Sequence, residues 1–225
     1  MTPKNDNEQA IKTFYIRKGQ PHIVPIGACF SVVMLAHDAV PAPKLEALRQ
    51  ERAMAVIALR RNQESDDAIA ALEAAYTEKM EDLLNAKHHQ EYPFRNAEAA
   101  RILMERIQLY DGKYYRLDAA CVMPNHLHLL LDFSIQLPEN WAEDSPVPGY
   151  QPLHKALGQI KGASARLINR AQGRSGELWS KGYYDRYIRN AWHWHNEYNY
   201  IANNPVCAGL VNDWALFPYT YLRQL

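Results

Sequence analysis

In the first 133 residues, the pattern of apolar and polar residues predicts three strands, and the last two of them form a hairpin. An apolar, β-rich stretch, "HIVPIGACFSVVML", covers residues 22–35 and is interrupted by Pro25 and Gly27. Over residues 115–123 every second position is apolar, which is the period of a strand. The tight turn "MPN" then leads into "HLHLLLDF", residues 126–133, which we expect to pair with the strand before it.

Spacings of three and four residues between apolar positions predict helices. Two of them, over residues 45–59 and 69–84, follow the first strand and form a helical insertion at about 44–92. Asn96 is placed to cap a third helix that runs to Leu109.

The second half of the chain adds a loop, two helices and a short strand. Residues 134–152 carry four prolines and a glycine, which is the composition of a loop, and a helix is expected from 153 to 171. The stretch "GELWSKGYYDRYIRN", residues 176–190, is typical of a short strand with a bend. A last helix over 191–203 is expected to end before Pro205.

Composition indicates a folded protein with one domain. The 225 residues are 48% hydrophobic and 22% charged, which provides enough apolar side chains for a core. We expect a flexible segment at 1–20 and a single domain over 21–225. The first thirty residues lack the pattern of a secretion signal, and no apolar run reaches about 18 residues, so neither export nor a membrane span is expected.

The three cysteines favour a reducing compartment. Cys29, Cys121 and Cys207 lie far apart and form no Cys-x-x-Cys pair. This spacing argues against a disulfide framework and against a thiolate zinc site, and it predicts a cytoplasmic protein.

A formal net charge of zero conceals two segments of opposite sign. Residues 151–190 hold eight Lys or Arg against two acids, a net of +6, whereas residues 62–92 hold eight acids against two Lys, a net of −6. The acidic segment coincides with the second predicted helix, and we expect it to be a solvated outer face of the insertion. Contacts with a polyanion are therefore expected only from the basic segment.

His126 and His128 are candidate metal ligands. Side chains alternate between the two faces of a strand, so both imidazoles point to one face with Leu130, while Leu127, Leu129 and Leu131 point to the other. Imidazoles at this spacing have Cβ atoms about 7 Å apart and can hold one metal ion. The His-x-His pattern also occurs on the wet face of half-buried strands, and a metal needs further ligands.

Further polar groups come from "YNYIANNPVCAGLV", residues 198–211. On a helix, Tyr200 and Asn204 are four residues apart and share a face, with His193 and Asn196 on the same stripe. A phenol and an amide are thus presented together. Each also has an ordinary explanation, as a half-buried aromatic residue and as a residue that ends a helix before proline.

Four blocks of sequence occur in an order and spacing typical of one protein family. They are "YYRLDAACVMPNHLHLLL", "LHKALGQIKGASARLINR", "GELWSKGYYDRYIRN" and "YIANNPVCAGLV". From about Phe30 to its C-terminus, the chain resembles the REP-associated tyrosine transposases of the single-tyrosine HUH nuclease superfamily. The His-hydrophobic-His motif of this family falls on His126 and His128. In the Tyr-Ile-x-x-Asn-Pro block, the nucleophile falls on Tyr200 and the asparagine, implied to be a third metal ligand, on Asn204.

The resemblance implies an α+β fold, ferredoxin-like or RRM-like, in which helices back an antiparallel sheet and the tyrosine helix packs across it. It also implies a divalent metal, Mg²⁺ or Mn²⁺, and single-stranded or hairpin DNA that is cut and rejoined through a 5′-phosphotyrosine. Because free tyrosine has a pKa near about 10, nearby positive charge is needed to activate it. The expected protein is a DNA nickase and strand transferase, either monomer or homodimer.

The resemblance also implies that the basic segment holds the DNA. Lys and Arg can neutralise phosphates, and flat aromatic side chains can stack on unpaired bases. The expected phosphate contacts are Lys155, Lys161, Arg166, Arg170, Arg186 and Arg189, and the expected stacking residues are Trp179, Tyr183, Tyr184 and Trp192. Charged helix faces and aromatic strands also occur in proteins that bind no DNA.

Two features differ from the family pattern. Cys207 stands where the family commonly has Arg or Lys, and the acidic insertion is longer than in the smallest members. They leave open a second hypothesis, a DNA- or RNA-binding regulator that keeps the fold but does not cut. Tyr198 points about 200° away from Tyr200 on a helix and is not the expected nucleophile.

Overall fold

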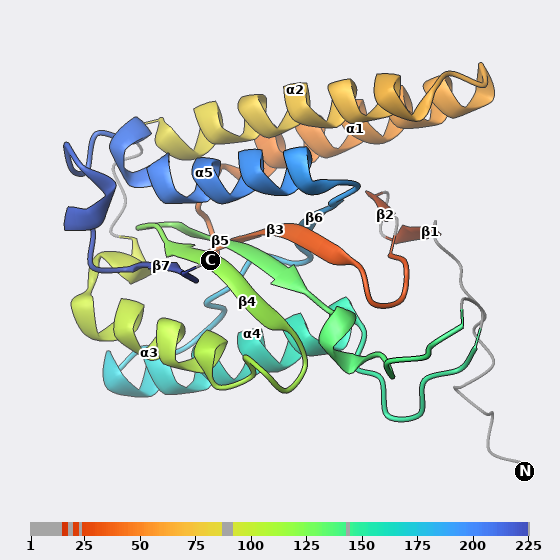
Figure 1. Ribbon diagram of the computed structural model, residues 1–225. Helices are drawn as coiled ribbons and strands as arrows, with labels where there is room; N and C mark the ends of the chain where they lie inside the picture. The colour runs from red at the N-terminus through yellow and green to blue at the C-terminus, as the bar shows by residue number, and fades with distance from the viewer. Residues whose placement is uncertain (1–14, 18–19, 23, 87–91, 143–144, 225) are drawn as a thin grey trace, which may run out of the picture.

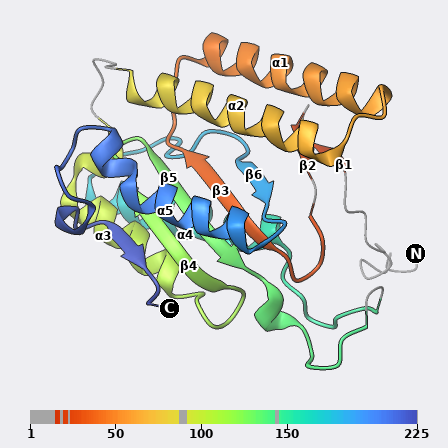
Figure 2. The same ribbon diagram turned by 45° about the horizontal axis from the view of Figure 1, so that its top comes forward.

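In the computed structural model, an antiparallel sheet of five strands forms the centre of the molecule (Figures 1 and 2). The structure describes residues 15–17, 20–22, 24–86, 92–142 and 145–224. The strand order is β6-β3-β5-β4-β7, and every neighbouring pair is antiparallel. The strands are β3 (Cys29–Leu35), β4 (Arg116–Val122), β5 (His126–Asp132), β6 (Tyr184–Tyr187) and β7 (Thr220–Leu222).

Helices cover both faces of the sheet. They are α1 (Ala42–Arg61), α2 (Asp66–Asn85), α3 (Ala97–Gln108), α4 (Leu153–Ala171) and α5 (Ala191–Cys207). The first two form an antiparallel hairpin, which we call the α1/α2 hairpin. Helices α3 and α4 pack side by side on one face, whereas α5 crosses the other face and the α1/α2 hairpin lies beside it (Figures 1 and 2).

The order of elements gives the sheet its ferredoxin-like topology. Strand β3 is followed by the insertion and α3, then by the β4–β5 hairpin, α4 and β6, and the last strand pairs with β3 at the sheet edge. This is a βαββαβ unit to which α5 and β7 are added. The predicted α+β fold with an antiparallel sheet backed by helices is confirmed. None of the described helices has the length and apolarity needed to cross a bilayer.

The first predicted strand starts later than expected. Strand β3 begins at Cys29, because the chain turns at Pro25 and Gly27 before it. Gly27 has a φ of 70°, and the side chain of Leu137 fills the place where a Cβ would lie. Upstream, β1 (Tyr15–Arg17) pairs with β2 (Gln20–His22), so the predicted flexible segment 1–20 contains regular structure. Its residues 1–14 lie outside the described residues.

A bulge in β4 changes the predicted alternation of its side chains. The register with β5 shifts between Leu117 and Ala119, so one extra residue, Asp118, enters the strand. Leu117 packs into the main core on the α3/α4 side, whereas Ala119 and Cys121 pack on the opposite side with Ile201 of α5. The expectation of one apolar face from 115 to 123 is therefore wrong, and both faces of the sheet are buried.

Helix α5 also continues beyond its predicted end. It runs through Pro205 to Cys207, so the expected end at residue 203 is wrong. Proline cannot donate to the carbonyl of Ile201, but the last turn is closed by hydrogen bonds from Ala208 N to Asn204 O and from Gly209 N to Val206 O. Asn204 therefore keeps a helical position, four residues after Tyr200.

Candidate active site

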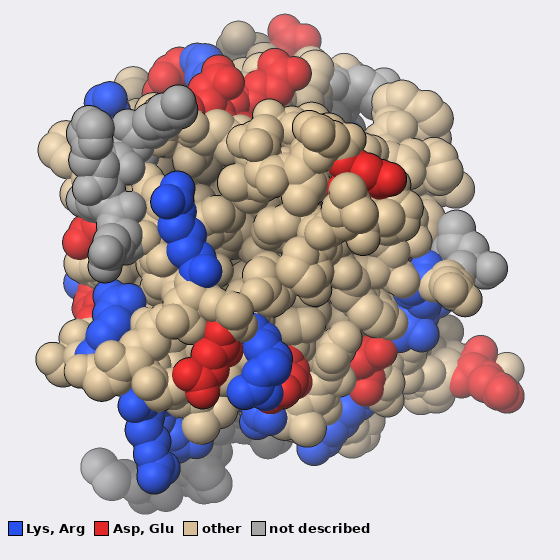
Figure 3. Space-filling model, turned by 90° about the vertical axis from the view of Figure 1, so that its left-hand side faces the viewer, with Lys and Arg blue, Asp and Glu red and all other residues tan. Residues whose placement is uncertain are grey.

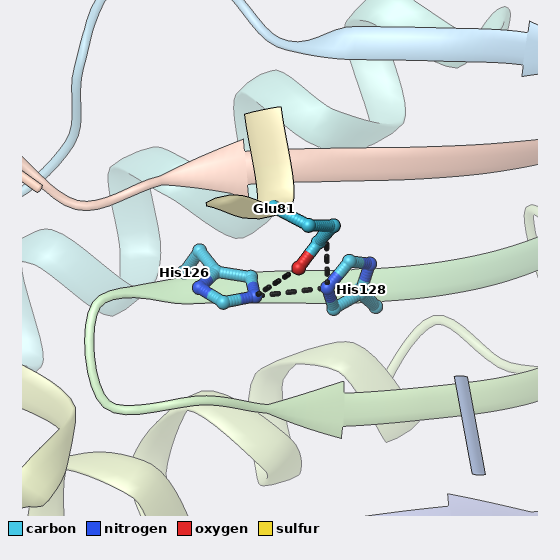
Figure 4. A group of neighbouring side chains, drawn as sticks. All are labelled: Glu81, His126 and His128. Atoms are coloured by element: carbon cyan, nitrogen blue, oxygen red, sulfur yellow. Dashed lines mark hydrogen bonds and ion pairs between the residues drawn. The ribbon is translucent and has the colours of Figure 1, made fainter. Parts of the chain in front are cut away.

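His126 and His128 lie side by side on β5, on the sheet face that α5 covers. Their Nε2 atoms are 2.9 Å apart and the rings meet edge to face (Figure 4). Each residue is only 1% exposed, so the possibility that they occupy a wet sheet face is wrong. The intervening Leu127 points to the α3/α4 side, as the strand period predicts.

Glu81 is the third member of the cluster, and it comes from α2. Its Oε1 lies 3.4 Å from His128 Nε2 and its Oε2 lies 4.0 Å from His126 Nε2 (Figure 4). The side chain is 11% exposed, so the expectation that the acidic segment is a solvated outer face is wrong at this residue. The sequence held one signal: Glu81 stands three residues before Leu84, on the stripe of α2 that also buries Met80.

The cluster has the ligand atoms and the free lone pairs that a divalent cation needs. The ligand atoms of Glu81, His126 and His128 all lie within 4.8 Å of one another. Both oxygens of Glu81 are buried and make no hydrogen bond of good geometry with any described residue. A buried carboxylate without donors is rare unless an ion completes its contacts, and imidazole with carboxylate suits several divalent metals. These residues therefore fit a divalent metal.

Burial keeps both histidines neutral. It lowers the pKa of His126 well below its usual value of 6.5, with a smaller contribution from His128. It also lowers the pKa of His128, although the carboxylate of Glu81 acts in the opposite direction there. A metal binds only an unprotonated nitrogen, and a neutral imidazole has one, so neither ring has to lose its charge before it can bind a metal at neutral pH.

Helix α5 brings Tyr200 against the histidines. Its ring meets the ring of His128 edge to face, with centroids 5.6 Å apart at an angle of 87°. The phenolic oxygen is buried and makes no hydrogen bond of good geometry with the described residues. Asn204 lies one turn further along α5 and is also buried, and its Oδ1 has no hydrogen-bond donor among them either. Asn196, expected on the same stripe, is exposed.

The surroundings of Tyr200 oppose its ionisation. Burial raises the pKa of the phenol, and the negative charge of Glu81 raises it further, whereas Arg186 acts in the opposite direction. The phenol is therefore neutral in this state. A cation between Glu81 and Tyr200 would remove the unfavourable contribution of the carboxylate.

A charged pocket opens beside the cluster, between the sheet, the α1/α2 hairpin and α5. Its empty volume is about 600 Å³ with the open mouth included, and Glu81 and Tyr200 form part of its wall. Arg186 on this wall pairs with Glu197, and Arg52 pairs with Glu73 at 2.7 Å. These buried pairs place two guanidinium groups within the walls of the pocket.

The basic side chains of α4 lie away from this cluster. Lys155, Arg166 and Arg170 are exposed, but α4 covers the sheet face opposite to His126 and His128. On the side of the molecule in Figure 3, acids gather at the top, where the α1/α2 hairpin lies, and the Lys and Arg below are interspersed with acids. The structure therefore does not bring the predicted basic contacts on α4 together with the site.

Three other predicted phosphate contacts are partly or wholly engaged with the protein. The ammonium group of Lys161 donates to the carbonyls of Ser180 and Gly182, and Arg186 is paired with Glu197. Arg189 is half-buried next to α5. Of these, Arg186 is the one that the structure places near Tyr200.

The predicted stacking residues are mostly covered by protein. The ring centroids of Trp179 and Phe94 are 5.0 Å apart, and Nε1 of Trp179 donates to the hydroxyl of Ser164, so this indole belongs to the core. Tyr183 is also buried, and Tyr184 is half-buried with its hydroxyl accepting a hydrogen bond from Arg49. The indole of Trp192, which is 75% exposed at the start of α5, has an open face.

Comparison with known proteins finds distant likeness among solved structures. No protein-family model matches the chain, and no curated protein matches it. Among solved structures it is similar to a REP-associated tyrosine transposase bound to a REP hairpin, with a TM-score of 0.48 and 14% identity. The likeness covers 92% of this chain and 80% of the other. Because it is distant, function has to be inferred from the side chains of this chain.

His193, in the first turn of α5, provides a pH test of this region. Burial together with Arg186 and Arg189 lowers its pKa from 6.5 to about 4. Between these values the unfolded chain binds more protons than the folded chain, so stability falls as the pH drops from about 6.5 to about 4. We expect His193→Gln to reduce the fall in Tm over this range, whereas His195→Gln, which changes an exposed residue of α5, leaves it unchanged. Equal slopes for both variants and the parent protein would contradict this assignment.

Proposed function

We propose that this protein is a metal-dependent endonuclease and strand transferase that acts on single-stranded or hairpin DNA, with Tyr200 as its nucleophile. The observation that carries the proposal is the contact between Tyr200 and His128, within a cluster that fits a divalent metal. The order of the sequence blocks that resemble REP-associated tyrosine transposases supports the same reaction. Mg²⁺ or Mn²⁺ is the proposed metal, held by His126, His128 and Glu81, with Asn204 as a further oxygen donor.

The reaction exchanges one phosphodiester for another. The Tyr200 oxygen forms a bond to phosphorus as the bond from phosphorus to the DNA 3′ oxygen breaks; the phenol gives up its proton and the 3′ oxygen gains one. When bound, the metal would supply positive charge that stabilises the negative charge of the phosphate in the transition state. The phosphotyrosine keeps the energy of the phosphodiester bond, so attack by a second 3′-hydroxyl reverses the step and joins DNA.

The residues around Tyr200 have distinct parts in this proposal. The ring contact with His128 holds the phenol beside the cluster, and Asn204 presents its amide from the same face of α5. Arg186 lies close enough to favour the ionised phenol, and in this proposal it also contacts the phosphate. Of the predicted basic residues, we therefore propose Arg186 for the reacting phosphate and the exposed Lys155, Arg166 and Arg170 for more distant DNA.

DNA reaches Tyr200 in this proposal only after a conformational change. The phenolic oxygen is buried, and Glu81 of α2 lies over the histidine pair. We therefore propose that the α1/α2 hairpin moves relative to α5 when DNA binds. The pocket between them marks where the two parts separate.

The proposal is tested with hairpin oligonucleotides that carry an unpaired flank and are labelled at the 5′ end in one sample and at the 3′ end in another. With Mn²⁺, the fragment on the 3′ side of the cut is expected to stay on the protein in a denaturing gel, because its 5′ phosphate is bound to tyrosine. The fragment on the 5′ side is expected to run free with a 3′-hydroxyl. EDTA or a fully paired strand is the control that should give no adduct.

A regulator that binds nucleic acid without cutting it is the second candidate. The observation that favours it is the burial of the Tyr200 oxygen next to a carboxylate that raises its pKa. For such a protein the hairpin should be retained in a mobility-shift experiment with Mn²⁺ while neither labelled fragment appears. That result would overturn the enzymatic proposal.

A further inference from the structure

Asn125, the residue directly before His126, connects the histidine pair to helix α2. Its side chain is only 3% exposed, and both ends of the amide are used. The Oδ1 atom lies 2.7 Å from Nδ1 of His126, and Nδ2 donates to the carbonyl of Leu84 at 3.0 Å. Its own backbone carbonyl accepts from Ala36 N at 2.9 Å, which fixes the turn between β4 and β5.

These contacts determine which nitrogen of His126 carries the proton. The carbonyl of Leu84 can only accept, so the amide nitrogen of Asn125 must face it, and Oδ1 must face His126. An amide oxygen can only accept, so Nδ1 of His126 is the protonated nitrogen. Its Nε2 then presents a lone pair toward His128 and Glu81, as a metal ligand must.

The same amide holds the end of α2. Leu84 is the second-last residue of this helix, so its carbonyl has no donor within the helix and takes one from Asn125. Glu81 stands three residues earlier and on the same side of the helix as Leu84. The side chain of Asn125 therefore orients the ring of His126 and anchors the turn of α2 that carries Glu81.

We propose that Asn125 is a positioning residue that sets the tautomer of His126 and holds Glu81 against the histidine pair. Asn125 acts through other residues and does not touch the reacting atoms. The effect on metal affinity rests on the metal site of the proposed function, whereas the effect on the tautomer does not depend on any metal.

The tautomer is measured by NMR on metal-free protein labelled with ¹⁵N-histidine. In the wild type, His126 is expected to carry its proton on Nδ1, and the missing signal in His126→Ala identifies the ring. Asn125→Asp still accepts from Nδ1 and should keep this tautomer, whereas Asn125→Ala should give a mixture of the two forms. A wild-type His126 protonated on Nε2, or an unchanged tautomer in Asn125→Ala, would overturn the inference.

Metal affinity is the second measurement, made by calorimetric titration with Mn²⁺. Asn125→Ala is expected to bind about 10–100-fold more weakly than the wild type, as is usual when the partner of a ligating histidine is lost. Asn203→Ala removes an exposed asparagine side chain of α5 and should bind like the wild type. If Asn125→Ala binds as tightly as the wild type, Asn125 has no positioning role for the metal.

The two variants of Asn125 also separate its two contacts. Asn125→Asp cannot donate to the carbonyl of Leu84, so it should retain the tautomer but lose order at the end of α2, seen as faster amide hydrogen exchange there. Equal exchange in Asn125→Asp and the wild type would contradict the anchoring of α2. A wild-type protein that shows the expected tautomer but forms no DNA adduct would remove the proposed function and leave this tautomer assignment intact.

Discussion

Tyr200→Phe is expected to abolish the covalent DNA adduct while metal binding and stability stay close to those of the wild type. The substitution keeps the ring that packs on His128 and removes only the attacking oxygen. That oxygen is buried and makes no hydrogen bond of good geometry, so its loss should change stability little. Adduct formation should fall by at least about 10³-fold, because the nucleophile itself is lost. Denaturing gels, calorimetry with Mn²⁺ and thermal melts measure the three properties.

Tyr198→Phe is the matched control, and the opposite pattern is expected from it. The hydroxyl of Tyr198 donates to the backbone carbonyl of Arg223 at 2.9 Å, so its loss should cost about 1 kcal/mol of stability. Adduct formation should persist, because this ring lies on another side of α5. If Tyr200→Phe still forms the adduct and Tyr198→Phe does not, the assignment of the nucleophile is wrong.

The helices and the strands β3 and β5 could largely be predicted from periodicity, because each has a run of one period, whereas the three-residue strand β7 was not predicted. In β5, the alternation of histidine and leucine correctly assigned each side chain to a face of the sheet. The alternation failed in β4, where Asp118 adds one residue to the strand. Contacts at this bulge include one from a distant residue, since the carboxylate of Asp118 accepts from Trp194 of α5 as well as from nearby Arg116.

The helical stripe of α2 could have shown that Glu81 faces the protein, but its contact with the histidines could not be predicted from neighbouring sequence. An acid within an acidic run has the same local pattern whether it faces solvent or a histidine pair, and only the position of α2 relative to β5 separates the two cases. The spacing of Tyr200 and Asn204 was more informative, because both lie on one helix and their common face follows from the helical period.

The predicted DNA contacts show that charge counted along the sequence does not reveal where the charged side chains lie in space. The excess of basic residues from 151 to 190 is real, but the segment runs from α4, on one face of the sheet, through the edge strand β6 to Asn190, the N-cap of α5. A sum over sequence therefore combines side chains that point in different directions. Arg186 lies beside Tyr200, whereas Arg166 and Arg170 of α4 are exposed elsewhere.

Glu81→Met is expected to change stability and metal affinity in opposite directions. Both oxygens of Glu81 are buried without a hydrogen-bond donor among the described residues, which costs free energy in the absence of a metal. A methionine of similar size should therefore stabilise the metal-free protein by about 1–3 kcal/mol, or roughly 2–4 °C in Tm for each kcal/mol. Mn²⁺ affinity should fall by more than about 100-fold, since losing an outer partner of a ligand alone costs about 10–100-fold.

The order of thermal stability should therefore reverse when metal is added. In EDTA, Glu81→Met should melt above the wild type; in saturating Mn²⁺ the wild type gains stability from binding and should melt above the variant. Glu78→Met changes an exposed acid of the same helix and should follow the wild type in both conditions. If Glu81→Met lowers the Tm of the metal-free protein and leaves Mn²⁺ affinity unchanged, Glu81 is a structural residue, and the metal site would have to be built from the histidines and Asn204 without it.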